Sequence, residues 1–522
     1  MTLVPAYRAP ALVAAAALLL LSACAETGDS KLLGDDKFKA RAAEVFIAGF
    51  GGVADKYIEP VAVHSIALNG MRGLGAIDPS LTVARDENRM VLFASGREVA
   101  RLPTPNDDDV VGWAKLAAEI SLAARGASSE LRAADVEALY EAVFDGVLAH
   151  LDIFSRYAGA AEARKNRAKR EGFGGIGIRY QIEDGVPVIQ NVLAGSPAAG
   201  AGLRKGDRVV AVDGATLKGL SRNEISDKLR GPVRSVVELT IDRPGASQAM
   251  VIDLERGHIF TVTVTATHND GVLYLKVGGF NQDTARALAE EIEKGRAALG
   301  DGMKGVILDL RGNPGGLLKQ SVKVADLLLT QGQIVSTRGR HADSIHYYEA
   351  GGRDLAVGMP VIVLVDGKSA SAAEIVAAAL QDRDRAVVIG TASFGKGSVQ
   401  TVIRLPNDGE ITLTWSRLYA PSGYLLHGLG VLPAICTSGV KDDTRSVIRA
   451  RLAQRAKTEE ALNAWRLSSA VNDAKRGKLR DSCPSQRRQD DFEVELARQL
   501  IDDKALYAEA LSLSTATHQA HY

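Results

Sequence analysis

The sequence predicts a multidomain α/β protein that carries a β-rich module and has helical segments at both ends. Its 522 residues exceed what one core organises, since a domain holds about 150 residues. Hydrophobic residues make up 46% and charged residues 24%, so most of the chain can bury cores, and overall disorder is excluded. From Val272 onward, Val/Ile-rich runs alternate with helical patterns, which is typical of a buried parallel sheet covered by helices.

Charge, histidine and cysteine content exclude several functional classes. Lys+Arg and Asp+Glu are equal at 63 each, so no bulk basic field favours nucleic acid as a partner. The three cysteines are too few for a disulfide scaffold or a Cys-rich metal site. None of the nine histidines lies in an HExxH or comparable zinc spacing, and no metal is expected.

The first 24 residues have the pattern of an export signal. Arg8 precedes the apolar run 11–21, which is shorter than the ~20 residues that a membrane-spanning helix needs. The following Ser22-Ala23-Cys24 resembles the bacterial lipobox, whose cysteine becomes the lipidated first residue. We expect a signal peptide over residues 1–23 and lipidation of Cys24; the alternative is a plain signal peptide with a chance cysteine.

An exported lipoprotein would lie in the bacterial cell envelope, facing the periplasm, with the lipid anchor as its membrane attachment. Ala25 replaces the aspartate that retains lipoproteins at the inner membrane in some bacteria, which slightly favours the outer membrane. Disulfides persist in such a compartment. Cys436 and Cys483 could therefore pair and tether the C-terminal tail to the core, or remain two separate thiols.

Regular elements can be placed along most of the chain. Helical spacing runs from Ala40 to about Arg72 and from Glu137 to Leu151, and the charge run 161–171 predicts a solvated linker helix. From Gly172, short β-like runs alternate with turns around one helix, 223–229. The predicted strands of this module are 176–181, 187–192, 208–212 and 236–242. The later α/β strands are 272–277, 306–309, 361–365 and 386–389, with helices 282–298, 319–329 and 372–380, and a helical tail over 442–514.

Three Gly- or Ser-rich stretches follow strands of the α/β part, where such folds place their chemistry. They are 309–316 (DLRGNPGG), 368–374 (KSASAAE) and 394–400 (FGKGSVQ). The third lies in a near-Walker A pattern, but Gly397 stands where a Mg²⁺-binding Ser or Thr is required, and a strand-like run follows instead of a helix. Nucleotide binding is therefore rejected.

A serine nucleophile with a lysine base fits these stretches. Ser371 lies at a strand-to-helix turn, where the Ala372 N–H can point at a developing oxyanion. Lys396 lies between glycines; burial would lower its pKa and let the neutral amine accept the serine proton. Taken singly, Ser371 could be a helix N-cap, Lys396 a turn residue and 313–316 a loop. Their order, each after a strand, favours the catalytic interpretation.

The chain resembles the carboxy-terminal processing (tail-specific) proteases of the S41 serine peptidase family. The resemblance covers about Tyr140 to Pro433, through "LDIFSRY", "GFGGIGI", "DLRGNPGGLL", "VLVDGKSASAAEI", "LQDRDRAVVIGTASFGKGSVQ" and "YAPSGYLLHGLGVLP". It implies a ClpP/crotonase-like peptidase core with a PDZ domain inserted ahead of it. The expected divisions are 1–23 (signal peptide), 24–170 (N-terminal helical segment and linker), 171–256 (PDZ), 257–436 (peptidase core) and 437–522 (C-terminal helical tail).

The resemblance also assigns residues. Ser371 matches the family nucleophile, Lys396 its base, and Gln400 the glutamine that orients the lysine in some members. Asp382 matches an acidic position implicated in others, although a surface role is as well supported. The amides of Ala372 and of Gly315 or Gly316 would form the oxyanion hole. The departures, Ala373, Ala434 and Ile153, leave the dyad untouched.

In the PDZ module, the segment from Phe173 to Ile178 resembles the loop that binds a peptide's free carboxylate. The amides of Gly174, Gly175, Ile176 and Gly177 would take the carboxylate, and Leu229 or Ile225 would line the pocket for the terminal side chain. The alternative is that this segment is only the start of a strand.

The resemblance implies a periplasmic serine endopeptidase that cleaves proteins near exposed C-termini through an acyl-enzyme, without a cofactor. The long N-terminal segment suggests a homodimer contact or a docking arm for an adaptor lipoprotein; its alternative is a structural cap. A rival hypothesis is a non-catalytic PDZ scaffold, or pseudopeptidase, which would not need Ser371 and Lys396. A peptidase-fold protein that binds small hydrophobic ligands would have no use for Lys396.

Overall fold

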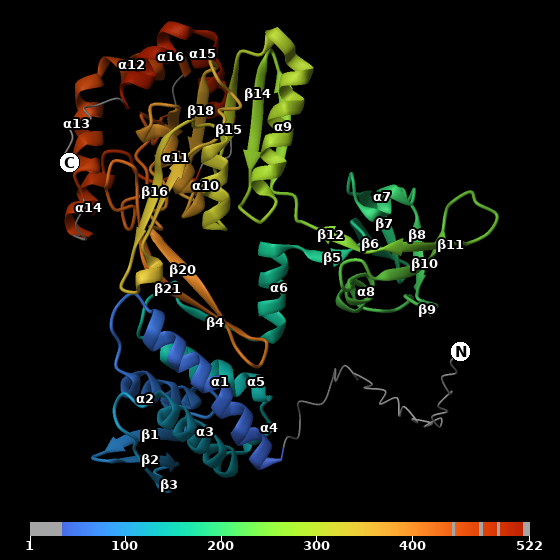
Figure 1. The fold of residues 1–522 in the computed structure, drawn as a ribbon, viewed down its shortest axis with the longest axis vertical. Coiled ribbons are helices and arrows are strands. Elements are labelled where there is room, and N and C mark those ends of the chain that lie inside the picture. The colour runs from blue at the N-terminus through green and yellow to red at the C-terminus, as the bar shows by residue number, and fades with distance from the viewer. Residues whose placement is uncertain (1–33, 441–443, 469–472, 488–490, 515–522) are drawn as a thin grey trace, which may run out of the picture.

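The computed structural model describes residues 34–440, 444–468, 473–487 and 491–514; the predicted signal segment and Cys24 lie outside the described residues. Figure 1 shows an N-terminal domain at the bottom, a large α/β core with a helical tail at the top, and the β-rich module at the side. No helix among the described residues is both long enough and apolar enough to span a membrane.

The N-terminal domain is helical, with a small sheet that the sequence analysis missed. Its aromatic core includes Phe38, Phe46, Phe50, Trp113 and Phe144, all nearly inaccessible to solvent. Its helices are α1 (Asp35–Lys56), α2 (Val63–Gly73), α3 (Val110–Ala127), α4 (Ser129–Ala133) and α5 (Val136–Leu148). The antiparallel sheet consists of β1 (Leu81–Asp86), β2 (Arg89–Ala94) and β3 (Arg97–Pro103).

The stretch of helical spacing from Ala40 to about Arg72 forms two helices. The structure divides it into α1 and α2, and the break contains Pro60. A proline cannot donate the helical hydrogen bond, and it disfavours helical geometry in the residue before it.

A short arm connects the N-terminal domain to the β-rich module. The arm consists of β4 (Arg156–Ala158) and α6 (Ala160–Glu171), followed by β5 (Phe173–Gly175). The charge run therefore forms the predicted helix, but one face of it is anchored rather than solvated. Arg167 and Arg170 donate to the Glu410 carboxylate at 2.9 and 3.0 Å, and the Glu410 side chain is only 2% exposed.

The β-rich module is built on the sheet order β11-β10-β8-β7-β6, with β9 paired to β8. Its strands β8 (Arg208–Val212) and β10 (Val236–Asp242) have the predicted bounds. The other elements are β6 (Ile178–Glu183), β7 (Val186–Val192), α7 (Pro197–Gly200), β9 (Ala215–Thr216), α8 (Arg222–Leu229), β11 (Met250–Glu255) and β12 (Gly257–Ile259). β5 and β12 carry the chain into and out of the module and pair with each other.

The α/β core contains a six-stranded sheet in the order β13-β14-β15-β18-β19-β22. All neighbouring strands from β14 to β22 are parallel, and β13 is antiparallel to β14. The strands are β13 (Val264–Asn269), β14 (Val272–Val277), β15 (Gly305–Asp309), β18 (Val361–Val365), β19 (Val387–Gly390) and β22 (Ile435–Cys436).

Both faces of this sheet are buried, which explains its continuous Val/Ile/Leu runs. Alternate residues point to opposite faces: Leu308 and Val363 pack in one cluster, and Ile307 and Ile362 in the other. One face is covered by α9 (Thr284–Leu299), α10 (Leu318–Asp326) and α11 (Ala372–Asp382). The tail helices over 444–453, 492–502 and 504–512 cover the other face, whereas Leu462 and Trp465 of the tail pack in the first cluster.

A second sheet, β17-β16-β21-β20, joins the core to the N-terminal domain (Figure 1). Its strands are β16 (Gly332–Arg338), β17 (His346–Ala350), β20 (Ser398–Arg404) and β21 (Glu410–Tyr419). β4 pairs with β21, and Ile411 and Leu413 of β21 belong to the N-terminal core. Strand β20, which begins at Ser398, thus packs directly against the N-terminal domain through Ile403.

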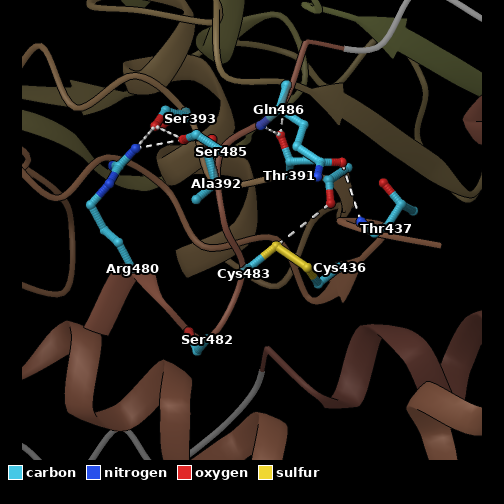
Figure 2. Close-up of a disulfide and its surroundings, with 12 residues drawn as sticks. Thr391, Ala392, Ser393, Cys436, Thr437, Arg480, Ser482, Cys483, Ser485 and Gln486 are labelled. Carbon is cyan, nitrogen blue, oxygen red and sulfur yellow. Dashed lines mark hydrogen bonds between the residues drawn. A yellow bond between two sulfur atoms is a disulfide. The ribbon is translucent and has the colours of Figure 1, made fainter. Parts of the chain in front are cut away.

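The tail is helical, as predicted: α12 (Thr444–Ala453), α13 (Arg455–Arg466), α14 (Asp473–Arg480), α15 (Phe492–Asp502) and α16 (Lys504–Ser512). The structure joins Cys436 of β22 to Cys483, with an S–S distance of 2.04 Å (Figure 2). The segment after Cys483 then runs along residues 391–393, because Ser485 donates to the Ala392 carbonyl and Thr391 Oγ1 donates to the Gln486 carbonyl.

Candidate active site

The three predicted loops meet at one edge of the core sheet. They follow the carboxyl ends of β15, β18 and β19, which are neighbours and parallel. Ser369 links them all: its hydroxyl donates to the Leu310 carbonyl at 2.9 Å, and its own carbonyl accepts from the Phe394 amide at 2.9 Å. Ser371 and Lys396, distant in sequence, therefore lie in adjoining loops.

Ser371 occupies a strained turn at the start of α11. Its φ is 54° and its ψ is −113°, a conformation that costs a non-glycine residue about 1–3 kcal/mol. Such strain is typical of a nucleophile turn between a strand and a helix. The half-buried Ser371 thus stands at the N-terminus of α11, where the helix dipole favours developing negative charge.

The proposed oxyanion donors do not all fit. The Gly315 amide already donates to Asn313 Oδ1 at 2.8 Å, so the expectation for Gly315 is wrong in this conformation. The amides of Ala372 and Gly316 have no acceptor within hydrogen-bond distance among the described residues. Glycine is needed at position 315 for space instead, because a Cβ there would lie 2.9 Å from Ser371 Cβ.

Lys396 lies between Gly395 and Gly397 in the loop after β19 and is half-buried. Burial lowers the pKa of Lys396, the charge of Arg156 lowers it further, and Glu374 and Asp152 oppose the shift. A lowered pKa increases the fraction of neutral amine, which is the form that can accept a proton from a serine. The lysine Nζ lies over the Phe154 ring, 4.9 Å from its centroid.

Glu374 joins the loop that carries Ser371 to the loop that carries Lys396, and this link was not predicted from the sequence. Its fully buried carboxylate accepts from the backbone amides of Ser371 (2.7 Å) and Lys396 (2.9 Å) through Oε2. Through Oε1 it accepts from the Gly395 amide (2.6 Å) and the Ser393 hydroxyl (2.5 Å). Complete burial raises the pKa of Glu374, although these four donors favour the charged form.

Gln400 lies on β20, four residues beyond Lys396. Its side-chain amide donates to Ser398 Oγ at 2.9 Å and to Thr414 Oγ1 at 3.3 Å. Neither bond reaches Lys396 directly. Thr414 Oγ1 donates in turn to Asp152 Oδ1 at 3.1 Å, which connects Gln400 to the loop that carries Phe154.

Asp382 lies away from Ser371 and Lys396. The alternative prediction, that Asp382 is a surface residue, is wrong. The residue is only 3% exposed and lies at the far end of α11 from Ser371, about 15 Å along the helix axis. Its carboxylate accepts from the Ser422 hydroxyl at 2.6 Å and pairs with Arg466 of α13 at 3.2 Å. Asp382 therefore ties a tail helix to the core.

The Gly-rich loop after β15 is braced by a buried ionic network. Burial would raise the pKa of Asp309, but the bonds and charge of Arg311, with the charge of Lys276, outweigh burial and hold that pKa below its usual range. Arg311 also pairs with Glu493 of α15 at 3.0 Å. The tail thus supports the loop that faces Ser371.

The β-rich module has an open strand edge beside a helix. β6 is the last strand of its sheet, and a cavity of about 80 Å³ lies between β6 and α8. Gly175, Ile176, Gly177 and Leu229, predicted for peptide binding, line this cavity. Ile225 instead belongs to the fully buried module core and Gly174 packs against Gly231, so neither of these two residues lines the cavity.

Comparisons with known proteins find matches to the core and to the β-rich module. The model of peptidase family S41 matches residues 271–437, and a PDZ domain model matches residues 188–243. A carboxy-terminal-processing protease of Bartonella bacilliformis is 40% identical over 303 residues, which cover 58% of this chain and 70% of that relative. The chain belongs to the S41 peptidase family. It is accordingly a serine-type peptidase with a PDZ domain.

Other relatives of this S41 peptidase are more distant. A probable CtpA-like serine protease of Staphylococcus aureus is 30% identical over 318 residues, which cover 60% of this chain. The match spans 63% of the staphylococcal relative's length. Among solved structures, the photosystem II D1 C-terminal processing protease is 24% identical, with a TM-score of 0.36, covering 77% of this chain and 92% of that one.

Two features of the S41 peptidase site had weak sequence signals. Glu374, three residues after Ser371, matches a helix capping pattern, so its spacing alone suggested only a structural role. Phe154 lies in "LDIFSRY", which pointed to the family but not to a contact with Lys396. Both roles depend on contacts between segments that are far apart in sequence.

Proposed function

We propose that this S41 peptidase is a periplasmic lipoprotein endopeptidase that cleaves proteins near their C-termini with a Ser371–Lys396 dyad. The observation that carries the proposal is the shared anchor: one buried carboxylate, Glu374, accepts from the backbone amides of both residues. The strained Ser371 turn and the lowered pKa of Lys396 support the same assignment.

In the proposed reaction, Ser371 Oγ attacks the scissile carbonyl carbon while its proton passes to Lys396 Nζ. The tetrahedral oxyanion accepts from the Ala372 amide and from the Gly316 amide. Collapse expels the leaving amine, which takes the proton from Lys396, and leaves an acyl-enzyme on Ser371. Water then attacks this ester, and Lys396 takes one water proton and returns it to Ser371 Oγ; the new carboxyl group departs and loses the second proton to solvent.

Tail recognition is assigned to the PDZ domain. An extended C-terminal segment would add to the open edge of β6, and the carboxylate would bind the amides of Gly175 to Gly177. The small cavity next to Leu229 suits an apolar terminal side chain. Protein substrates with exposed C-termini are the ligands proposed for this surface.

The remaining proposals concern assembly and location. The parallel core sheet with helices on both faces supports a ClpP/crotonase-like peptidase core. The sequence pattern up to Cys24 supports lipidation and a place in the periplasm, with the outer membrane slightly favoured. A homodimer and an adaptor lipoprotein docked on the N-terminal domain remain proposals from the family resemblance.

The test is cleavage of an unfolded reporter that carries an apolar C-terminal tail. We expect the wild type to cut it, and Ser371→Ala and Lys396→Ala each to lose about 10³-fold or more in kcat/KM. Lys319→Ala, which alters an exposed lysine on α10, is the matched control and should retain wild-type activity.

Other outcomes would contradict either the proposed activity or the role of one residue. Tail binding by the wild type without any cutting would favour the non-catalytic scaffold. Cutting that survives Ser371→Ala would contradict the assignment of the nucleophile, and cutting that survives Lys396→Ala would contradict that of the base.

A further inference from the structure

The N-terminal domain reaches the proposed general base through one aromatic ring. Lys396 Nζ lies over the face of Phe154, which follows α5 in the sequence. Within the described parts of the chain, Lys396 Nζ forms no hydrogen bond or ion pair, either with Ser371 or with a carboxylate. The contact with the Phe154 ring, whose centroid lies 4.9 Å from Nζ, is therefore the one that defines the position of the lysine head group.

The loop that presents Phe154 is held from two sides. Asp152 Oδ1 accepts from the Phe154 amide at 2.7 Å and the Ser155 amide at 3.0 Å. The Ser155 hydroxyl donates to Asp152 Oδ2 at 2.8 Å and accepts from the Thr414 amide of β21 at 3.2 Å. The Phe154 ring also makes a T-shaped contact with the His427 ring, with centroids 6.4 Å apart. The position of the ring is thus built into the fold.

A benzene face attracts an ammonium group but has no comparable attraction for a neutral amine. The other groups around Lys396 act in both directions: burial and Arg156 of β4 disfavour its charge, while Glu374 of α11 and Asp152 favour it. His427 lies against the same ring, and Arg480 of α14 lies beside Gly395, bonded to the carbonyls of Leu429 and Ser393. Among these groups, Phe154 is the one over whose ring face Lys396 Nζ lies.

We propose that Phe154 is a positioning residue for Lys396. In the resting enzyme, the Phe154 ring holds the protonated lysine side chain away from Ser371. The inference rests on the proposed role of Lys396 as the base. The flexible lysine chain turns toward Ser371 Oγ once it has lost its proton, because the neutral amine gains little from the ring and can accept from the serine hydroxyl.

Phe154→Leu tests the inference, because it keeps an apolar side chain and removes the ring. In the purified full chain, kcat/KM for reporter cleavage is measured against pH, and each profile is scaled to its own plateau. We expect the acidic limb to move to lower pH, so that scaled kcat/KM at a fixed pH on that limb rises about two- to fivefold. Phe154→Tyr, which keeps the ring, should restore the wild-type limb. Ile153→Ala is the matched control, since the neighbouring Ile153 side chain is 89% exposed.

A limb that stays in place or moves to higher pH in Phe154→Leu would overturn the proposal. A second readout does not depend on catalysis: carbamylation of the Lys396 amine by cyanate, followed by mass spectrometry at several pH values. Only the neutral amine reacts, so Lys396 should be modified about two- to fivefold faster in Phe154→Leu than in the wild type or Ile153→Ala. Faster modification in a protein that never cleaves would retain the role of Phe154 and reject the proposed function. Equal modification rates in an active enzyme would reject Phe154 alone.

Discussion

At the scale of single residues, Ser371 carries a conflict between stability and function. Its backbone has φ 54° and ψ −113°, which glycine adopts without strain. Ser371→Ala keeps the strain and Ser371→Gly removes it, while both remove the proposed nucleophile. We expect the thermal unfolding midpoint of Ser371→Gly to lie about 2 °C above that of Ser371→Ala. This corresponds to about 1 kcal/mol of unfolding free energy, which is the relief of strain less the greater chain entropy of glycine in the unfolded state. Thermal unfolding of both full chains measures the difference; equal midpoints would mean that the turn is not strained.

The same scale shows which site residues can be predicted from the sequence. Ser371 and Lys396 could be proposed as site residues because each follows a recognisable strand and lies among small residues. Glu374 could not be proposed in this way, because a glutamate three residues after a serine has the pattern of a helix cap. Its function comes from accepting the amides of Gly395 and Lys396, which lie more than twenty residues away along the chain.

At the scale of secondary-structure elements, buried parallel strands were the most predictable. The runs 272–277 and 361–365 match β14 and β18 residue for residue, because strands covered on both faces are continuously apolar. The sheet of β16, β17, β20 and β21 was largely missed. Its strands mix buried and exposed residues and bury one side against another domain, so their sequence pattern is weaker.

The disulfide is the element-scale constraint that can be tested directly. Cys436 and Cys483 are separated by 47 residues, and the bond holds the tail against the segment that leads to Lys396. We expect the Cys436→Ser/Cys483→Ser double variant to lose about 2–4 kcal/mol of unfolding free energy, because the unfolded chain is no longer constrained. Urea unfolding measures the loss. Reductant should lower the wild type to the level of the variant and leave the variant unchanged; a reductant effect on the variant would show that another bond is responsible.

At the scale of the whole molecule, the contacts between domains were beyond sequence analysis. The PDZ domain and the peptidase core could each be recognised from their own motifs. The anchoring of α6 on β21 could not, because Arg167 and Glu410 are separated by 243 positions and neither has a distinctive neighbourhood. A charged helix with no apolar face is therefore predicted as solvated, although two of its arginines bind a buried carboxylate.

This anchor should control how firmly the PDZ arm is held. Glu410 is almost fully buried and pairs with both Arg167 and Arg170, so Glu410→Gln leaves two guanidinium groups without their counter-charge. We expect α6 to open more often and trypsin to cut within 164–170 about tenfold faster, which is the effect of about 1.4 kcal/mol on local opening. Glu171→Gln is the matched control, because that carboxylate is 41% exposed and its ion pairs, with Arg404 at 3.5 Å and with Arg170 at 3.9 Å, are long. Equal cutting of Glu410→Gln and the control would mean that packing, rather than this ion pair, holds the arm to the core.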